Sequence, residues 1–587
     1  HLSNSKESIL TNNMVIYNTW AAISLRRSGN STLTNNTIIN NARKGISLGN
    51  SGNSTLENNT ITNNLHGFYL YNSSNSILTN NMIINNQDSG MTIVIEASVS
   101  EYCIPNIRIA DNIFINCSLG IYRTYDYFTH GYYWGPKPED FYHVEVLNNT
   151  INGKLLLVWL NKTGEIVPSG VGQIILVNCR SITVTGLDLF KLEGYNSSNL
   201  YIYDNTLSGI YIEGDNNNVS HNELYNDGSI YIWGNNSIIS HNELSNGGGI
   251  GNNGANNILS YNDLSNGGDI DIHGENITLS NNIVSDSELY AISTYLVNST
   301  ITNNIINNSG WSGIFVKSCE NTVISSNIVT NSGWYGIAVH NSANCSVVGN
   351  TVRDSKWSGI HVWYSNNTRI YFNNFYDNNV AFLDGITQAN DNFGAHNSFA
   401  YNYWNDLTGP DANSDGIVDK SYSIDGTKGN RDYYPLVAPN PLQKHLLVPP
   451  SLIYPNGNEN INNTVTIYWI SAMDSFNHPI TYSVYYSPDD GNNWELLAAN
   501  LVSTSLVWDT SSLPSGTDYL VKVVAQCSEG LTAEDISYRT FRILNFPTTS
   551  STSSSTSDYS TFGFTLISIF AILPVIIQKK LNQRKSQ

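Results

Sequence analysis

A row of histidines beside a row of carboxylates recurs at a fixed interval in the middle of the chain. Residues 220–224 and 240–244 both read Ser-His-Asn-Glu-Leu, and residues 261–264 read Tyr-Asn-Asp-Leu. Imidazoles and carboxylates act as general acids and bases on sugar chains, and they also bind metals. If Asn and Leu face inward, the catalytic candidates all face outward: His221, Glu223, His241, Glu243 and Asp263. The alternative is that duplication of the repeat placed these residues on a solvated face.

An aspartate-rich segment has the spacing of a calcium-binding loop. Oxygen ligands at loop positions 1, 3, 5 and 9, with Gly at position 6, match the first part of an EF-hand-type loop. Position 12 is Tyr422 rather than Glu, so Asp425 or another group would have to supply the last ligand. We predict Ca²⁺ as a cofactor, and the alternative is an Asp/Asn/Gly-rich turn without metal. The predicted ligands are Asp411, Asn413, Asp415, Ile417 (through its carbonyl) and Asp419.

These candidates are embedded in a repeat that determines how they can be positioned. The second Asn of a recurring Asn-Asn pair falls at residues 13, 36, 59 and 81, and matching positions return between residues 205 and 373 in steps of 17 to 23. Such a period indicates a solenoid, because each unit can bury its apolar face only against its neighbours. Asn tolerates the positive φ that tight corners need, and stacked Asn side chains can hydrogen-bond between coils. We therefore interpret the Asn column as architectural.

Within each repeat the apolar pattern has a period of two. Examples are residues 45–48 (Gly-Ile-Ser-Leu), 313–316 (Gly-Ile-Phe-Val) and 336–339 (Gly-Ile-Ala-Val). This alternation predicts short strands with one face buried. A unit of about 20 residues fits one turn of a β-helix with two or three such strands. The sequence therefore predicts an all-β fold built on a parallel β-helix solenoid.

A column of tryptophans accompanies this pattern. Trp311, Trp334 and Trp357 are 23 residues apart, and each lies two residues before the Gly that opens a strand. Since coils stack at about 4.8 Å, the three rings should lie one above another. We predict them as ligand-binding platforms for sugar rings. The alternative is an aromatic stack that stabilises the turns.

The repeat reads Gly-Ile-x-Val/Leu, then Ser-x-Asn-x-x-Ile, then Asn-Asn-x-Ile, and it resembles the right-handed parallel β-helix repeats of NosD-like proteins. Carbohydrate-binding and sugar-hydrolase β-helices share that repeat. Residues 149–179 look like an insertion common in such chains, and residues 402–406 with 432–436 look like the segment that closes the helix. The resemblance implies a right-handed parallel β-helix over residues 1–400, with insertions near 95–145 and 150–180. A closing segment with the calcium-type loop would follow at 401–437.

The remainder of the chain predicts a second domain and an anchor. Alternating runs in residues 448–545 predict a β-sandwich, and Trp469 and Tyr519 resemble the core Trp and corner Tyr of fibronectin type III domains. A Ser/Thr-rich stalk follows at 546–560, then a single transmembrane helix at 561–578 and a basic cytoplasmic tail at 579–587.

This layout predicts a single-pass cell-surface protein with its N-terminal bulk outside. The C-terminal layout also resembles the Pro-Gly-Phe sorting tails of archaeal surface proteins, with Phe562 in place of Pro. Because His1 lies close to the first repeat, we expect a capping segment before it. Glycosylation sequons fit an outside location, among them Asn30, Asn53, Asn161, Asn276, Asn298 and Asn462.

The composition limits which classes of partner the protein can bind. The formal net charge is −20, from 47 Asp and Glu against 27 Lys and Arg, which argues against nucleic acid as a partner. The leading hypothesis is a surface-anchored β-helix with a glycan-binding or envelope-structural role, toward a polysaccharide or cell-envelope glycan. One alternative is a polysaccharide lyase, epimerase or hydrolase acting on the β-helix face. Another is a NosD-like role in copper handling.

Overall fold

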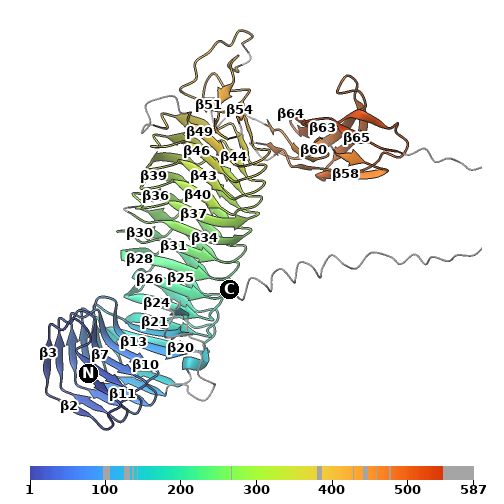
Figure 1. Ribbon diagram of the computed structural model, residues 1–587. Helices are drawn as coiled ribbons and strands as arrows, with labels where there is room; N and C mark the ends of the chain where they lie inside the picture. Colours follow the sequence, from blue (N-terminus) through green and yellow to red (C-terminus); the bar gives the residue numbers. More distant parts are fainter. Residues whose placement is uncertain are drawn as a thin grey trace, which may run out of the picture. The chain divides into compact units, whose positions relative to one another are not determined.

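The computed structural model describes most of the chain up to residue 545. The described residues are 1–96, 106–124, 133–134, 138–141, 143–265, 267–379, 387–414, 416–427, 429–439, 447–457, 459–474 and 478–545. The chain divides into two compact units, residues 1–445 and 446–587 (Figure 1). Among the described residues the only helix is α1 (Pro138–Phe141), which has four residues. The all-β prediction, with a parallel solenoid, is confirmed.

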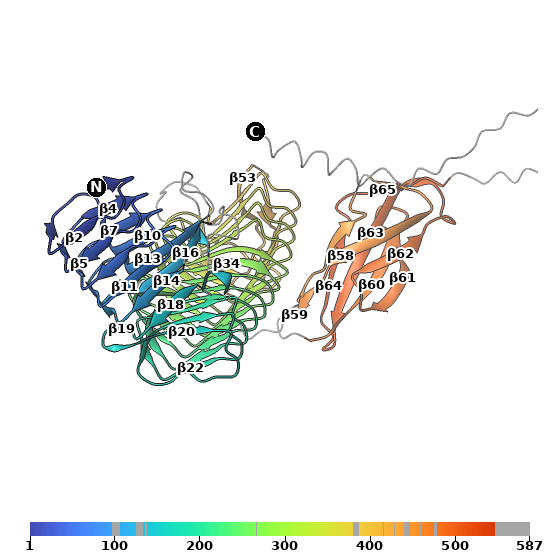
Figure 2. The ribbon, with the colours of Figure 1, turned by 90° about the horizontal axis from the view of Figure 1, so that it is seen from below.

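The first unit begins with a stack of coils, each made of three short parallel strands (Figure 2). Three ladders therefore run along the stack. One extends from β1 (Leu2–Ser3) to β17 (Tyr133–Trp134), one from β2 (Ile9–Thr11) to β18 (Val144–Leu147), and one from β3 (Met14–Ile16) to β19 (Thr150–Ile151). Strand β20 (Lys154–Leu160) pairs antiparallel with β19 and parallel with β21 (Val171–Val177), and so joins this stack to the next.

The second stack also carries three ladders. Two of them run from β22 (Thr183–Thr185) to β54 (Arg431–Asp432) and from β23 (Asp188–Leu189) to β51 (Tyr403–Trp404). The third, called here the long ladder, holds the strands that matter for function. Its strands are β21, β24 (Lys191–Tyr195), the second halves of β26 (Thr206–Glu213) and β28 (Glu223–Trp233), β31 (Ile250–Asn253), β34 (Ile270–Glu275), β37 (Ile292–Val297), β40 (Ile314–Lys317), β43 (Ile337–His340), β46 (Ile360–Trp363) and β49 (Ala389–Asn392).

Alternate residues of every strand fill the interior. On β34, for example, Ile270 and Ile272 are fully buried, whereas Asp271 and His273 between and after them are exposed. The buried Ile, Leu and Val side chains form two clusters, one for each stack. Because side chains in a strand alternate between the two faces, strands such as β28, β31 and β34 present every second residue away from the core.

The Asn column has the architectural role that the repeat predicts, but its two functions fall on adjacent residues. Asn35 has a φ of 56° and forms the corner, whereas Asn36 is buried and bonds to the next coil. In the second stack Asn262 Nδ2 donates to Asn282 Oδ1 and to the carbonyl of Ile239, both at 2.9 Å. The buried Asn thus satisfies backbone groups that would otherwise be unpaired inside the corner.

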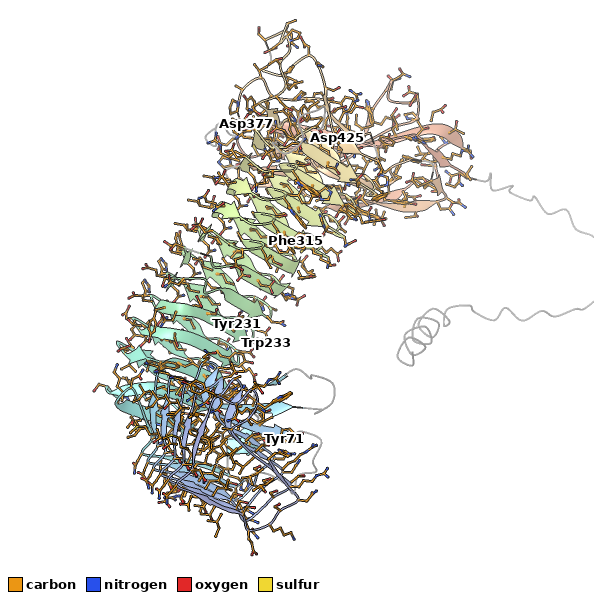
Figure 3. All side chains as sticks on the ribbon, turned by 60° about the vertical axis from the view of Figure 1, so that its left-hand side comes forward. Tyr71, Tyr231, Trp233, Phe315, Asp377 and Asp425 are labelled. Carbon is orange, nitrogen blue, oxygen red and sulfur yellow. The ribbon has the colours of Figure 1, made fainter. Side chains whose placement is uncertain are left out.

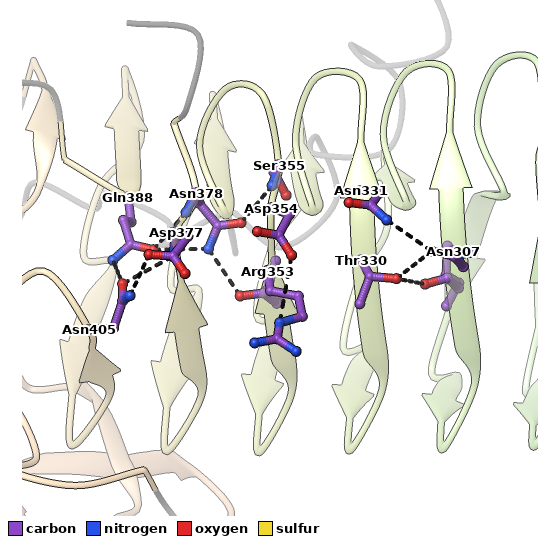
Figure 4. A network of polar contacts seen from close by, with 12 residues as sticks. Asn307, Thr330, Asn331, Arg353, Asp354, Ser355, Asp377, Asn378, Gln388 and Asn405 are labelled. Carbon is purple, nitrogen blue, oxygen red and sulfur yellow. Dashed lines mark hydrogen bonds and ion pairs between the residues drawn. The ribbon is translucent and has the colours of Figure 1, made fainter. Parts of the chain in front are cut away.

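Polar contacts also join neighbouring coils at an exposed corner (Figure 4). Thr330 Oγ1 donates to Asn307 Oδ1 at 2.8 Å, and Asn331 Nδ2 donates to the same oxygen at 3.2 Å. Farther along, Asn405 Nδ2 donates to Asp377 Oδ1 at 2.7 Å. These contacts hold successive turns in register.

The second unit is built from mostly antiparallel strands, described here by itself. One sheet contains β56 (Ser451–Tyr454), β58 (Thr464–Ile470) and β62 (Ser505–Asp509). Another contains β57 (Asn460–Ile461), β60 (Ile480–Ser487), β61 (Glu495–Leu501), β63 (Gly516–Cys527), β64 (Thr532–Ile536) and β65 (Phe541–Ile543), and β55 (Leu447–Val448) pairs with β59 (Met473–Asp474). Trp469 and Tyr519 lie in its buried core.

Several predictions fall outside the described residues. They concern Asp415, part of the insertion near 95–145, the stalk at 546–560, the transmembrane helix at 561–578 and the tail at 579–587. Within the described ranges, no helix is long and apolar enough to cross a membrane.

Candidate functional site

The outward face of the long ladder carries two aromatic rings beside polar groups. In the register of the ladder, Tyr231 of β28 lies next to Gly251 of β31, which lies next to Asp271 of β34. One outward position farther along the strands, Trp233, Asn253 and His273 form a parallel row. Tyr231 and Trp233 alternate with buried residues, so both project from the same side of β28 (Figure 3).

The ring of Tyr231 lies against the backbone of Gly251. A Cβ atom at Gly251 would come within 2.4 Å of Tyr231 Cδ1 and 2.5 Å of Cε1, so only glycine leaves room for the ring. Tyr231 is 47% exposed and Trp233 is 50% exposed. Among the described residues neither ring stacks on another ring. Tyr231 therefore rests one ring face on the sheet and presents the other to solvent. We call Tyr231, Trp233, Gly251 and Asn253 the ring surface.

An acidic hollow adjoins the ring surface, lined by Asp227 of β28 and by residues that precede β31, β34 and β37. It has a volume of about 780 Å³. Its lining is Asp227, Asn246, Gly247, Gly267, Asp269, Asp286, Glu288 and Leu289. None of these eight residues is Lys or Arg. Asp269 precedes Asp271 by two positions on the same face, which connects the hollow to the ring surface.

One carboxyl group of this connection has a shifted pKa. Partial burial, followed by the charge of Asp271, raises the pKa of Asp269. Asp271 Oδ1 lies 3.6 Å from His273 Nε2, and the His273 ring stacks on Tyr295 with centroids 4.5 Å apart. Asp271 therefore lies between the carboxylates of the hollow and the aromatic residues of the ring surface.

The predicted histidine and carboxylate rows lie on a different part of the coil. Asn222 and Leu224 are buried, and His221, Glu223, His241 and Glu243 are exposed, as the pattern predicts. The fifth candidate, Asp263, is half-buried. Both histidines have positive φ, at a corner. The rings of His221 and His241 stack with centroids 4.8 Å apart, and Tyr261 continues the stack at 4.9 Å.

The carboxylates of this row occur in register on neighbouring strands. Glu223 pairs with Glu243, and Glu243 pairs with Asp263. The structure therefore brings like charges together in one column. Within the part of the chain that the structure describes, no group of three or more His, Cys, Asp or Glu residues could hold a metal ion.

The tryptophan column stacks as its spacing predicts. The centroids of Trp311 and Trp334 are 4.8 Å apart, and those of Trp334 and Trp357 are 5.7 Å apart. Both faces of Trp334 are therefore covered by neighbouring rings. Tyr335 also packs edge-on against Trp357, with centroids 5.6 Å apart. Because a sugar ring stacks on a free aromatic face, this geometry favours the turn-stabilising alternative.

A pair of histidines from neighbouring coils lies near this column. His340 Nε2 lies 2.9 Å from His361 Nδ1, and Tyr335 stacks on His361 at 4.0 Å. Burial lowers the pKa of His340 to about 4, with a contribution from Lys317, and lowers that of His361 to about 3, with a contribution from His340. The pair is therefore neutral at pH 7 and packs as part of an outer aromatic cluster.

The calcium-type loop is tied together by its own carboxylates. Asp411 Oδ2 accepts a hydrogen bond from Gly416 N at 3.0 Å, and Asp419 Oδ2 accepts one from Ala412 N at 2.8 Å. Ile417 forms a bridge with Leu436 of the closing segment. Both carboxylates point into the loop, whereas the predicted ligand Asp415 lies outside the described residues.

Sequence reasoning missed the ring surface and the acidic hollow. A signal was present in residues 269–273, where Asp-Ile-Asp-Ile-His places three polar groups on one face of a strand. The rings of Tyr231 and Trp233 carry the same alternation, and the 20-residue step places residues 231, 251 and 271 in one column. The sequence does not indicate that the ring of Tyr231 packs onto Gly251.

Comparisons with known proteins agree with this fold. The family described as periplasmic copper-binding protein (NosD) matches residues 1–145, and the family described as right handed beta helix region matches residues 290–418. These matches confirm the predicted right-handed β-helix. No curated protein matches the chain.

Among solved structures, tailspike protein 3 of bacteriophage CBA120 is 12% identical, with a TM-score of 0.24, and the match covers 68% of this chain and 57% of that one. Full-length tailspike protein 2 from an Escherichia coli O157:H7 bacteriophage is 10% identical, with a TM-score of 0.21. That match covers 89% of this chain and 64% of the tailspike chain. This chain thus spans less than two thirds of either tailspike. At such TM-scores the likeness carries no argument about the site.

Proposed function

We propose that this protein is a glycan-binding β-helix whose ligand lies on the outward face of the long ladder. The observation that carries the proposal is the ring of Tyr231, which rests on Gly251 and leaves its other face exposed. A pyranose ring has a face of C–H groups and a rim of hydroxyls. The C–H face suits an aromatic ring, and the rim suits neighbouring polar groups such as Asn253 and Asp271.

A glycan panel tests this proposal. The full chain should bind at least one polysaccharide, and Tyr231→Ala should weaken that binding at least tenfold. Tyr201→Ala is the matched control, because Tyr201 is 48% exposed but lies on β25 (Tyr201–Tyr203), in another ladder. Equal binding by the wild type and Tyr231→Ala would contradict the proposed location.

A second candidate function is polysaccharide cleavage or epimerisation. The supporting observation is the carboxyl pair of Asp269 and Asp271, in which the raised pKa of Asp269 suits a general acid beside a base. New reducing or unsaturated ends in the panel, lost in Asp269→Asn, would favour this function. Retention of the products in Asp269→Asn would remove Asp269 from it. No observation on the described residues favours copper handling over these two.

We also propose Ca²⁺ binding at the loop of residues 411–419. The inward carboxylates of Asp411 and Asp419 support it. Adding Ca²⁺ should raise the melting temperature of the chain, and Asp411→Ala should abolish that increase. An equal increase in both proteins would place the effect elsewhere.

Surface display remains part of the proposal. The stalk and apolar segment of residues 546–578 support anchoring with the β-helix outside the cell. The second unit would act as a fibronectin type III-like spacer. The Tyr519 hydroxyl supports this, because it donates to the carbonyl of Pro514 at 2.7 Å in the manner of a corner tyrosine. Protease treatment of intact cells should release residues 1–545 if this is correct, and complete protection would contradict it.

A further inference from the structure

The ring surface lies beside a group of carboxylates. Asp271 adjoins it in the ladder, and the hollow beyond contributes Asp227, Asp269, Asp286 and Glu288. None of the four hollow carboxylates forms an ion pair with a described Lys or Arg. The long ladder holds two lysines. Lys191 of β24, two strands before β28, pairs with Glu193 at 2.8 Å, and Lys317 of β40, three strands beyond β31, lies over the ring of Tyr295 at 5.6 Å from its centroid.

This charge distribution disfavours anionic sugars and favours cationic ones. A uronate or sulfate group on Tyr231 would approach several carboxylates, while the nearer lysine of the ladder, Lys191, is already paired with Glu193. Like charges repel more strongly where water is partly excluded. An ammonium group in the same place would offset those carboxylates. The net charge of −20 acts in the same direction at longer range.

From this complementarity we infer that the ring surface binds a glycan of amino sugars, with a sugar ring on Tyr231 and its ammonium groups toward Asp271 and the hollow. The inference rests on the proposed glycan-binding function and specifies the class of ligand. Trp233, two residues along β28, provides a second ring for the adjoining sugar unit. The exposed fractions of both rings, about half in each case, leave their faces accessible.

Gly251 is a positioning residue for this surface. A methyl group there would overlap the Tyr231 ring, so the ring must tilt away from the sheet. Because Gly251 is half-buried on the outward side of β31, Gly251→Ala can relieve the overlap by rotating Tyr231 and leave the core intact. The substitution therefore removes the platform while retaining the tyrosine.

The test compares three oligosaccharides of similar length by titration calorimetry against the full chain. They are a β-1,4-linked glucosamine hexamer, its N-acetylated counterpart, and an oligogalacturonate. The glucosamine hexamer should bind at least tenfold more tightly than the N-acetylated one, and the oligogalacturonate should not bind measurably. Added salt should reduce the difference in affinity between the glucosamine hexamer and its N-acetylated counterpart.

Single-residue variants test the aromatic platform and the carboxylates separately. Tyr231→Ala and Gly251→Ala should each weaken glucosamine binding at least tenfold, and Tyr201→Ala should leave it unchanged. Asp271→Asn should reduce the preference for the amino form while preserving the melting temperature. Circular dichroism of each variant verifies that the β-helix is folded.

The outcomes distinguish failure of this inference from failure of the proposed function. Equal affinity for the amino and N-acetylated hexamers, or tighter binding of oligogalacturonate, would overturn the amino-sugar inference and leave glycan binding in place. Unchanged affinity in Tyr231→Ala would overturn the assigned surface. Failure to bind any glycan of the wider panel would overturn both.

Discussion

At the scale of single residues, the buried Asn ladder contributes to the stability of the coil. Asn262 donates two side-chain hydrogen bonds, and its Oδ1 accepts two more, from Asn242 N at 3.1 Å and Asn242 Nδ2 at 2.9 Å. Asn262→Ala would leave several of these partners buried and unpaired. We expect a loss of about 3 kcal/mol in unfolding free energy. Urea denaturation measures it, with the exposed Thr278→Ala as the control; similar losses in both would contradict the role of the ladder.

The histidine pair predicts a pH dependence of stability. His340 and His361 have pKa values of about 4 and about 3 in the folded chain, below the value of 6.5 for an unperturbed histidine. The unfolded chain therefore binds more protons between pH 6.5 and pH 3. Stability contributed by the pair is fully present above pH 6.5 and is lost as the pH falls toward the folded values.

Thermal unfolding between pH 7 and pH 4 measures this effect. His361→Phe should flatten the decline, because the buried group can no longer be protonated. His221→Gln is the control, since His221 is exposed at a corner and should leave the decline unchanged. An identical pH profile for His361→Phe and the wild type would assign the decline to other groups.

At the scale of elements, the tryptophan column is expected to stabilise turns rather than bind ligand. Trp334 has a neighbouring ring on each face, and its backbone N–H donates to the Trp311 carbonyl at 2.7 Å. We expect Trp334→Ala to lower the unfolding free energy by about 2 kcal/mol, through lost ring contacts, and to leave glycan affinity unchanged. Loss of affinity at unchanged stability would return the column to the predicted role of sugar platform.

The sequence predicted elements better than it predicted the site. Period-two alternation and recurring Asn are local signals, so the strands, the corners and the inward Asn222 could be predicted without knowing the fold. The 20-residue step also places residues 231 and 251 side by side in neighbouring coils, but the packing of the Tyr231 ring onto Gly251 could not be predicted, because it depends on the rotamer of Tyr231. The hollow depends further on the turns around Asn246 and Gly267, whose lengths set how far Asp227 lies from Asp286. Such distances follow from the assembled coils.

At the scale of the whole molecule, the buried hydrophobic residues form three separate cores. The β-helix has one cluster for each stack, and residues 447–543 form a third around Trp469 and Tyr519. Apolar burial is the main source of stability, so a unit with its own core can fold on its own. A long solenoid, in contrast, gains stability mainly from contacts between neighbouring coils.

These separate cores predict that the second unit unfolds independently of the β-helix. Residues 446–545 expressed alone should show one cooperative transition, at the temperature of the corresponding transition in the full chain. Trp469→Ala should lower that transition only, because Trp469 is 3% exposed in the third core, and Asn262→Ala should lower only the β-helix transition. Differential scanning calorimetry of the two variants makes the measurement. A shift of both transitions by either substitution would mean that the two units are energetically coupled, and would argue against a passive spacer between the β-helix and its anchor.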